Sequence, residues 1–346
     1  MFNIKVLMNH TGSQAIDIIN LLHKENIEVL YLGNEKENNI KNVADEFLVE
    51  RSDFNNIKDY VDYLIEICKE KNIDVFIPLR KMEELSTYKK DFNDNNIKVL
   101  IPNDIELFKI LNNKAKTYEL LKTDFPELIP EYYIVNNYKD FVNACKTIHD
   151  KGKEVCIKYV SDIASNSFRI INYKRHSLSE LDVKTNEEKS RLSHMVDYDD
   201  LENAIFFEQL KKDLMVMEYI KGYEISCDCI KTKEKNIIIP RIKTSGKEQL
   251  IAKNKQIMNY CKKILNLINY DTPCNIQFKL SNEKLFLLEI NTRMSGGIII
   301  AYKATNINIP AIAVNQILDN PVKFNDDWKD KTIILKNEYQ IKEESE

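Results

Sequence analysis

Short apolar runs alternate with amphipathic stretches along the first hundred residues of the chain. Runs of about four to eight apolar residues are typical of buried strands, and apolar positions three and four apart are typical of helices. The pattern predicts strands at residues 4–8, 27–32, 75–78 and 98–102, with helices at 15–22 and 57–71. Because strands that alternate with helices favour a parallel sheet with crossover helices, we expect an α/β fold.

The remainder of the chain carries a denser series of strands. Strands are predicted at residues 132–135, 155–159, 237–243, 274–280 and 285–293, and a pair of strands within 214–228 flanks a turn at Lys221 and Gly222. Helices are predicted from Asn103 and Asn112 onward and at 139–149, 201–210, 253–268 and 311–318. This region therefore reads as a second, mixed α/β unit.

Composition narrows the class of protein. The 346 residues are 43% hydrophobic and 30% charged with a net charge of -4, which predicts two or three globular domains and gives no support to a nucleic-acid partner. No apolar run approaches membrane-spanning length, and the N-terminal run is too short for a signal peptide, so we expect a cytoplasmic protein without a membrane partner.

The residues with reactive side chains suggest little chemistry of their own. The seven cysteines form no Cys-x-x-Cys pair, so we expect reduced thiols, with Cys227 and Cys229 as core residues rather than metal ligands. His176 and His194 are interpreted as surface histidines. A dinucleotide-dependent oxidoreductase is a weaker alternative, because the first strand is followed by only Gly12 of the three glycines expected for that site.

The segment from residue 285 to residue 297 has the strongest chemical pattern in the chain. Strand alternation places polar side chains on one face together with two leucines: Leu285, Leu287, Glu289, Asn291 and Arg293. The other face is apolar and can be buried: Phe286, Leu288 and Ile290. Carboxylate and amide oxygens suit a divalent cation and arginine suits phosphate, so the polar row indicates a nucleotide site. An edge strand with a solvated polar face is the alternative.

Residues 289–297 read Glu-Ile-Asn-Thr-Arg-Met-Ser-Gly-Gly and resemble the Glu-x-Asn-x-Arg metal-binding strand of the ATP-grasp superfamily, in the branch near carbamoyl-phosphate synthase and biotin carboxylase. A lysine strand, a hinge with two glutamates and a glutamine strand precede it in the family's order, so the resemblance covers roughly residues 105–315. It implies a Rossmann-like domain at 1–104 and an ATP-grasp domain at 105–320. The latter would comprise a small lid subdomain at about 120–220 and a central and C-terminal subdomain at about 221–320. An extension at 321–346 would end in a disordered tail.

The resemblance also implies roles for individual residues. It assigns contacts with ATP to Lys114, Lys158, Glu218, Tyr219, Ile220, Glu224 and Leu287. It assigns Mg²⁺ or Mn²⁺ to Gln277, Glu289 and Asn291, and the stabilisation of charge during transfer to Arg293, Arg241 and Lys158. Without the resemblance, Lys114 would be a solvated helix lysine and residues 214–228 a hairpin with solvated carboxylates.

The implied activity is that of an ATP-dependent ligase. A carboxylate or bicarbonate would attack the terminal phosphate of ATP, and an amine would displace phosphate from the resulting acyl phosphate. The partners would be small-molecule carboxylates and amines, and a homodimer is possible because dimers are common in the family. The loop at 161–167 occupies the place of the family's glycine-rich lid but contains no glycine, so a nucleotide-binding protein with little ligase activity is the alternative.

One geometric condition follows from the metal assignment. Gln277 must pair directly with Glu289 if both side chains are to lie on the same face of the two neighbouring strands. We expect this pairing to need a loop with an odd number of residues, for example from Ser281 to Leu285, since a four-residue loop would turn Gln277 away.

Overall fold

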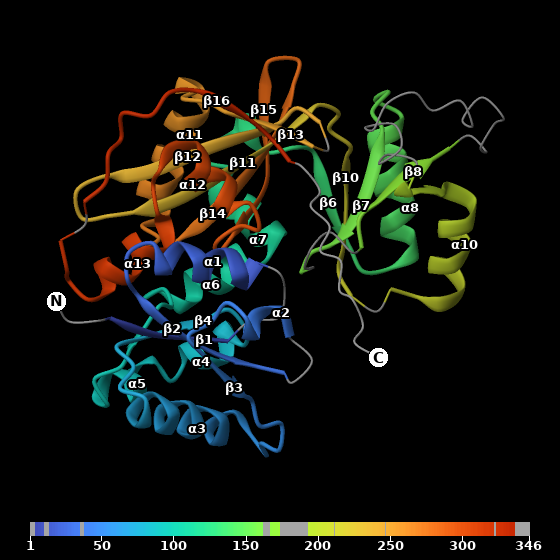
Figure 1. Ribbon diagram of the computed structural model, residues 1–346. Helices are drawn as coiled ribbons and strands as arrows, with labels where there is room; N and C mark the ends of the chain where they lie inside the picture. Colours follow the sequence, from blue (N-terminus) through green and yellow to red (C-terminus); the bar gives the residue numbers. More distant parts are fainter. Residues whose placement is uncertain are drawn as a thin grey trace, which may run out of the picture.

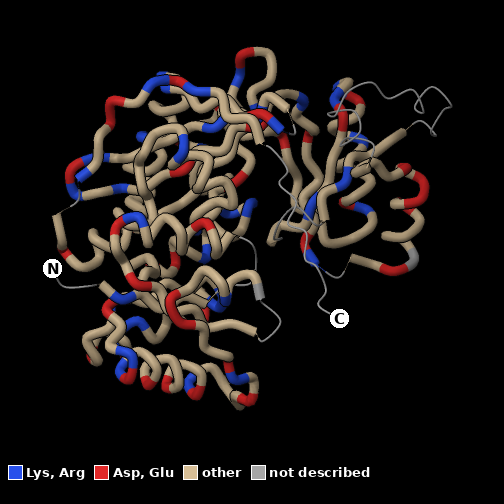
Figure 2. Tube along the Cα trace, in the orientation of Figure 1, with Lys and Arg blue, Asp and Glu red and all other residues tan. Residues whose placement is uncertain are grey.

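The computed structural model describes residues 4–9, 14–34, 38–161, 167–173, 193–210, 212–245, 247–321 and 323–335, and these residues form three β-sheets (Figure 1). Gly12, His176, most of the loop at 161–167 and the C-terminal tail, for which the sequence analysis made predictions, lie outside the described residues. None of the described helices is long and apolar enough to cross a bilayer. Acidic and basic residues are interspersed along all three parts of the fold (Figure 2).

The first sheet is wholly parallel, as the alternation of strands and helices predicted. Its strand order is β3-β2-β1-β4-β5. The strands are β1 (Lys5–Asn9), β2 (Glu28–Gly33), β3 (Glu46–Val49), β4 (Val75–Pro78) and β5 (Lys98–Val99). The sequence pattern did not predict β3, which has only four residues.

Helices cover both faces of the parallel sheet. On one face lie α3 (Ile57–Glu70), α4 (Met82–Ser86) and α5 (Lys89–Asp94), and α2 (Asn38–Lys41) packs beside β3. The helix α1 (Gln14–His23) lies on the other face and packs against helices α12 (Ile298–Thr305) and α13 (Ile309–Ile317) from the far end of the chain. This shared core joins the first part of the chain to the last.

The second sheet has the strand order β6-β10-β7-β8-β9 and lies on the right in Figure 1. Its strands are β6 (Tyr132–Val135), β7 (Val155–Tyr159), β8 (Arg169–Asn172), β9 (Met195–Asp197) and β10 (Leu214–Glu218). Helices α8 (Tyr138–His149) and α10 (Tyr198–Glu208) bury one of its faces. The short strands β8 and β9 were not predicted from the sequence.

The third sheet is antiparallel, with the order β15-β14-β11-β12-β13-β16. Its strands are β11 (Tyr223–Lys231), β12 (Asn236–Lys243), β13 (Glu248–Ile251), β14 (Cys274–Ser281), β15 (Lys284–Asn291) and β16 (Lys331–Ile334). Helix α11 (Lys255–Ile268) packs on one face, and α12 and α13 pack on the other. Strand β16 comes from the predicted extension at 321–346, which therefore contributes an edge strand.

Three short helices connect the first sheet to the second. They are α6 (Ile105–Leu111), α7 (Lys114–Leu121) and a 3-10 turn (Pro126–Leu128). Asp104 and Asn113 cap α6 and α7, because their side chains accept the backbone N–H groups three residues further on. These caps fix the start of α7, and with it the position of Lys114.

The seven cysteines are all unpaired and buried. Cys227 and Cys229 lie wholly inside the core between the third sheet and α11, as the sequence analysis expected of core thiols. Burial raises the pKa of each of these two thiols, which keeps them protonated and poorly reactive. Among the described residues there is no group of three or more His, Cys, Asp or Glu side chains that could hold a metal ion.

Candidate functional site

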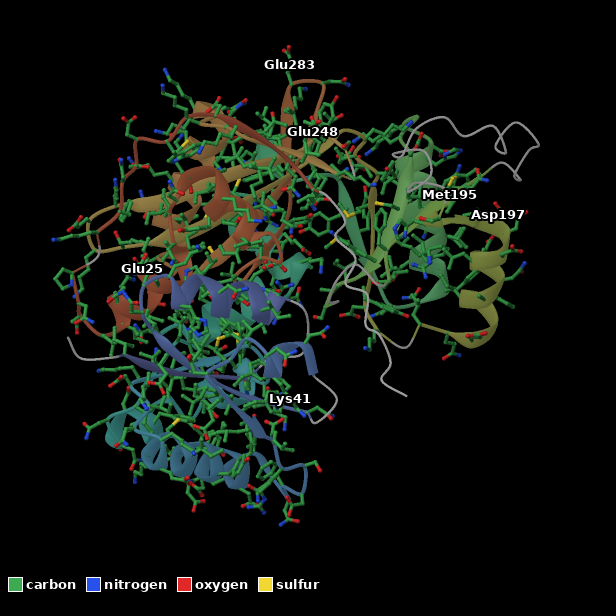
Figure 3. All side chains as sticks on the ribbon, in the orientation of Figure 1. Glu25, Lys41, Met195, Asp197, Glu248 and Glu283 are labelled. Carbon is green, nitrogen blue, oxygen red and sulfur yellow. The ribbon has the colours of Figure 1, made fainter. Side chains whose placement is uncertain are left out.

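The hairpin of β14 and β15 pairs Gln277 directly with Glu289, as the metal assignment requires. The route to this pairing differs from the prediction. Asn282 and Glu283 form a two-residue turn with φ values of 48° and 64°, a type common in tight hairpins. The loop therefore has an even number of residues, whereas an odd number was predicted. Glu283 projects at the tip of the hairpin (Figure 3). A β-bulge restores the register, because Phe278 pairs with Leu287 whereas Gln277 pairs with Glu289.

The bulge also changes which side chains share a face of β15. Leu285, Leu287 and Ile290 are all buried in the same core cluster, whereas Glu289 and Asn291 are partly exposed. The prediction that Leu287 shares a face with Glu289 is therefore wrong, because Leu288 is the extra residue that breaks the alternation. Leu287 is wholly buried and pairs with Phe278 on the core face, and its contact with ATP stays a prediction.

The carboxylate of Glu289 has a cation on one oxygen and an amide on the other. Lys114 Nζ lies 3.3 Å from Glu289 Oε2, and Asn291 Nδ2 donates to Glu289 Oε1 at 2.9 Å. Lys114 is only 8% exposed, and its backbone N–H donates to the carbonyl of Val160 at the end of β7. The reading of Lys114 as a solvated helix lysine is therefore wrong.

A second buried lysine, Lys158 of the second sheet, also interacts electrostatically with Glu289. Lys158, near the end of β7, is 9% exposed and lies 6.0 Å from the centre of the Tyr118 ring. Burial, and secondly repulsion by Lys114, lowers the pKa of Lys158 to about 8, while attraction to Glu289 opposes both. Lys114 thus forms an ion pair with Glu289, and Lys158 interacts with the same carboxylate electrostatically, which leaves net positive charge between the second and third sheets.

The charge of Glu289 is maintained by these neighbours. Burial is the largest influence on its pKa and raises it, but Lys114, the hydrogen bond from Asn291 and Lys158 together bring the pKa below its ordinary value. Glu289 is therefore ionised at neutral pH. An ionised carboxylate is the form that a metal ion requires.

The amides beside Glu289 are oriented so that their oxygens are available. Gln277 Nε2 donates to Asn275 Oδ1 at 3.0 Å and Asn291 Nδ2 donates to Glu289, while within the described part of the chain neither amide oxygen accepts a hydrogen bond. One carboxylate and two amide oxygens fit Mg²⁺, which takes only one or two protein carboxylates when substrate phosphates complete its shell. Gln277, Glu289 and Asn291 would be the residues that hold it.

Arg241 stands at the centre of a buried polar network. Its guanidinium, which is 2% exposed, donates to Asp228, Gln249, Ser226 and Ser295 at 2.7, 2.8, 3.0 and 2.8 Å respectively. A Cβ on Gly297 would lie 2.3 Å from Arg241 Nη1, so the guanidinium requires glycine at that position. The role of Arg241 in transfer stays a prediction, and what the structure shows is a fixed guanidinium beneath the loop that follows β15.

Arg293 lies where the third sheet meets the parallel sheet. Its Nη1 donates to the carbonyl of Met294 at 3.0 Å, and the same carbonyl accepts a hydrogen bond from Gln14 Nε2 of α1 at 2.6 Å. A cavity of about 20 Å³ separates Arg293 from Pro78 at the carboxyl end of β4. The first part of the chain therefore borders the site.

The segment between β10 and β11 joins the second sheet to the third, so its reading as a hairpin is wrong. Glu218 accepts the backbone N–H of Glu131 and pairs with Lys153, with Nζ and Oε2 2.7 Å apart. The Tyr219 N–H donates to the carbonyl of Glu154 at 2.8 Å, whereas the Ile220 N–H has no acceptor among the residues that the structure describes. Glu224, beyond the turn, pairs with Lys243.

Gly222 fixes the geometry of this connection. Its φ of 133° lies outside the range of most side chains, and a Cβ there would come within 2.0 Å of the carbonyl oxygen of Leu280. Glycine therefore lets the segment between the two sheets pass close to β14.

Sequence reasoning missed residues that hold the predicted ones in place. Asn275 bridges Gln277, Ser226 and Asp228, and Tyr118 donates its hydroxyl to the carbonyls of the bulge at Leu287 and Leu288, each at 3.0 Å. Asn275 lies two residues before Gln277, so strand alternation already placed it on the same face. No sequence signal pointed to Tyr118. His194, interpreted as a surface residue, is partly buried with its ring edge against Phe168.

Comparisons with known proteins agree with the fold described above. Residues 210–339 match the family described as ATP-grasp in the biosynthetic pathway with Ter operon. The biotin carboxylase domain of 2-oxoglutarate carboxylase from Hydrogenobacter thermophilus is similar in structure, with a TM-score of 0.63 at 16% identity over 92% of this chain and 70% of that chain. Biotin carboxylase from Campylobacter jejuni is also similar, with a TM-score of 0.66 at 13% identity over 95% of this chain and 74% of that chain.

N5-carboxyaminoimidazole synthetase from Staphylococcus aureus is also similar, with a TM-score of 0.64 at 12% identity over 93% of this chain and 79% of that chain. At these identities the likeness establishes the fold. The same fold is supported by the three sheets, of which the second and third are joined by a hinge. The family match over residues 210–339 agrees with it. The chain therefore has the fold of biotin carboxylase and N5-carboxyaminoimidazole synthetase, and its residues 210–339 match an ATP-grasp family.

Proposed function

We propose that the protein is an ATP-dependent ligase that joins a carboxylate, or bicarbonate, to an amine and converts ATP to ADP and phosphate. The observation that carries this proposal is the convergence of Lys114 and Lys158 on Glu289, with the amide oxygens of Asn291 and Gln277 beside it. The Hydrogenobacter thermophilus domain, which has the same fold, was solved with MgADP, ADP and bicarbonate. That complex supports ATP, Mg²⁺ and a small anionic substrate.

In the proposed reaction an oxygen of the carboxylate attacks the terminal phosphorus of ATP and ADP leaves. The amine nitrogen of the second substrate then attacks the acyl carbon, phosphate leaves, and the amine loses a proton. Mg²⁺, or Mn²⁺, bound at Gln277, Glu289 and Asn291 would neutralise charge on the phosphates. The side chains of Lys114, Lys158 and Arg293 position the phosphates and stabilise the negative charge that develops during transfer.

The hinge supplies the groups proposed for the rest of the nucleotide. The Ile220 N–H is available to the edge of the adenine, next to the carbonyls of Glu218 and Tyr219. Glu224, which pairs with Lys243 in the structure, would accept the ribose hydroxyls after it separates from that lysine. We also propose a homodimer, because the Hydrogenobacter thermophilus domain was solved as a dimer. We propose activity in the cytoplasm on the basis of the sequence, whose seven cysteines form no Cys-x-x-Cys pair and are expected to stay reduced.

The proposal is tested by measuring phosphate release from MgATP with a panel of amino acids, other carboxylates and bicarbonate, each with and without an amine. We expect release that depends on one carboxylate and increases with one amine. Lys114→Met should abolish it, whereas Lys116→Met, on the exposed side of the same helix, should not. Equal activity of Lys114→Met and the wild type would contradict the assignment of this site.

A nucleotide-binding protein with little ligase activity is the second candidate. It is favoured by the loop at 161–167, which contains no glycine to help its backbone N–H groups surround a phosphate. Calorimetry distinguishes the two candidates. ATP binding that depends on Lys114 and Lys158, without phosphate release for any member of the panel, would favour this second candidate.

A further inference from the structure

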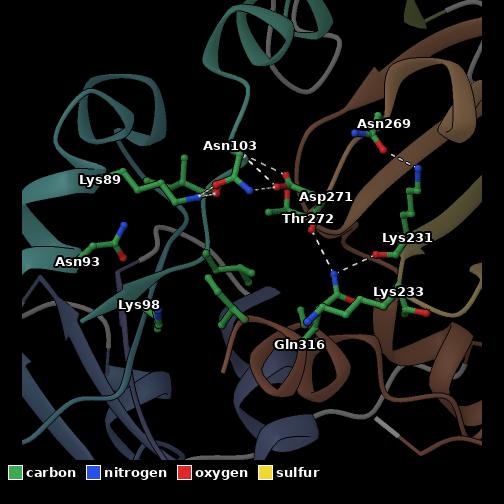
Figure 4. Close-up of a pocket in the computed structure, with 15 residues that line it drawn as sticks. Lys89, Asn93, Lys98, Asn103, Lys231, Lys233, Asn269, Asp271, Thr272 and Gln316 are labelled. Carbon is green, nitrogen blue, oxygen red and sulfur yellow. Dashed lines mark hydrogen bonds between the residues drawn. The ribbon is translucent and has the colours of Figure 1, made fainter. Parts of the chain in front are cut away.

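A cavity of about 420 Å³ lies between the parallel sheet and the third sheet (Figure 4). Its walls come from α5 and β5, from the turn after β11, from the segment between α11 and β14, and from α13. None of the residues assigned to the nucleotide site lines it. A volume of this size suits a small organic metabolite.

The wall of this cavity carries more positive than negative charge. Four lysines line it, Lys89, Lys98, Lys231 and Lys233, together with one carboxylate, Asp271. Lys89 Nζ donates to neutral acceptors, the Ile101 carbonyl and Asn103 Oδ1, at 2.5 and 2.8 Å, and Lys231 Nζ donates to Asn269 Oδ1 at 2.6 Å.

The remaining charged groups do not cancel this excess. The side chain of Lys98 has no hydrogen bond or ion pair within the described part of the chain, although its charge helps to lower the pKa of Asp319, with which Lys233 Nζ pairs at 2.6 Å. Asp271 accepts two hydrogen bonds from Asn103, one from the backbone N–H and one from the side chain. Apart from Lys233, three lysines therefore face the cavity, and Asp271, whose charge acts on Lys89, is the one carboxylate among the described lining residues; this excess of positive charge favours an anionic ligand.

The cavity also presents an unused hydrogen-bond acceptor. Gln316 Nε2 donates to the carbonyls of Lys231 and Asp271, at 3.0 and 3.5 Å, and these bonds fix the orientation of the amide. Gln316 Oε1 is buried and, among the described residues, has no hydrogen-bond partner. A buried acceptor without a donor is costly, so a hydroxyl or amine of a ligand would be stabilised there. Apolar side chains complete the wall, among them Leu100, Ile101 and Ile317.

We propose that this cavity is a second ligand site, separate from the nucleotide site, that binds a small organic phosphate carrying a hydroxyl or amine donor. The phosphate lies among Lys89, Lys98 and Lys231, whose ammonium groups act as point charges for phosphate oxygens. The donor of the ligand bonds to Gln316 Oε1, and its carbon skeleton packs on the apolar wall.

Calorimetric titration with glucose 6-phosphate, inorganic phosphate and glucose tests this site in the full-length protein. We expect glucose 6-phosphate to bind more tightly than either of the other two, because they supply only the phosphate or only the hydroxyls. Lys98→Gln should weaken the binding of glucose 6-phosphate about twofold to fivefold, the upper part of the range expected for one exposed charge contact. Lys262→Gln, an exposed lysine on α11, is the matched control and should have no effect.

Two further variants separate this site from the nucleotide site. Lys158→Met should weaken ATP and leave glucose 6-phosphate unchanged, whereas Lys98→Gln should do the reverse. The proposal is overturned if glucose 6-phosphate does not bind, if inorganic phosphate binds as tightly, or if Lys98→Gln binds glucose 6-phosphate like the wild type. It is also overturned if Lys158→Met abolishes the binding of glucose 6-phosphate, which would place that ligand in the nucleotide site.

Discussion

The depressed pKa of Lys158 makes the affinity for ATP depend on pH. Burial and the nearby Lys114 lower this pKa to about 8, from an ordinary value of about 10.4. The side chain is therefore charged in about 90% of free molecules at pH 7 and in about 10% at pH 9. The phosphates of ATP change their charge little over the same range, because a terminal phosphate with a pKa of about 6 is already about 90% ionised at pH 7.

If only charged Lys158 contacts the phosphates, the affinity for ATP falls in proportion to the charged fraction. The expected loss from pH 7 to pH 9 is about tenfold, or about 1.4 kcal/mol. The effect on folding has the opposite sign. Because the folded pKa is the lower one, the unfolded chain binds more protons between pH 8 and about 10.4, so the contribution of Lys158 to stability rises with pH. A loss of affinity in this range therefore does not arise from unfolding caused by Lys158.

The assay is calorimetry of ATP at pH 7, 8 and 9, with Mg²⁺ and again with a chelator. Lys158→Arg keeps its charge throughout and should bind ATP with little dependence on pH, while Lys158→Met should bind weakly at every pH. The reasoning is refuted if the wild type binds equally well at pH 7 and pH 9. It is also refuted if Lys158→Arg loses affinity as steeply as the wild type.

Three further outcomes are expected. Glu289→Ala should abolish ATP turnover, and Glu283→Ala, at the tip of the same hairpin, should retain it in a phosphate-release assay. Tyr118→Phe leaves a bulge carbonyl without its donor and should lower the free energy of unfolding in urea by about 1–3 kcal/mol, against little change for Tyr132→Phe, whose hydroxyl bonds an exposed glutamate. Because every thiol is buried, Ellman's reagent should label none of the seven cysteines rapidly until the protein is unfolded.

Local patterns predicted most helices and the longer strands because each depends on a run of neighbouring residues. Val75–Pro78 and Val155–Tyr159 are apolar runs whose bounds match the prediction. Strands such as Arg169–Asn172 and Met195–Asp197 have three or four residues and little apolar character of their own, and they form because neighbouring strands supply their hydrogen bonds. The assignment of β10 and β11 to separate sheets likewise depends on partners distant in sequence.

In the candidate site, the sequence predicted which residues belong together but not how deeply they are buried. Motif resemblance placed Lys114, Lys158, Gln277, Glu289 and Asn291 in one set, and the structure brings Lys114, Lys158, Glu289 and Asn291 together and pairs Gln277 with Glu289. The sequence contained no measure of burial. The depressed pKa of Lys158 follows from the enclosure of two lysines between two sheets, which only the tertiary fold supplies.

The β-bulge at Leu288 interrupts strand alternation because the regular register would have a higher free energy. With a two-residue turn and no bulge, Leu288 would pair with Gln277, and Glu289 would pair with Ile276 in the core. Burying a carboxylate without a partner costs several kcal/mol, whereas one disrupted ladder hydrogen bond costs about 1 kcal/mol. The bulge is therefore the cheaper arrangement. The burial of Leu285, Leu287 and Ile290 shows the bulge, because the spacing of these buried residues changes from two to three across Leu288 and Glu289, which keeps the carboxylate on the open face.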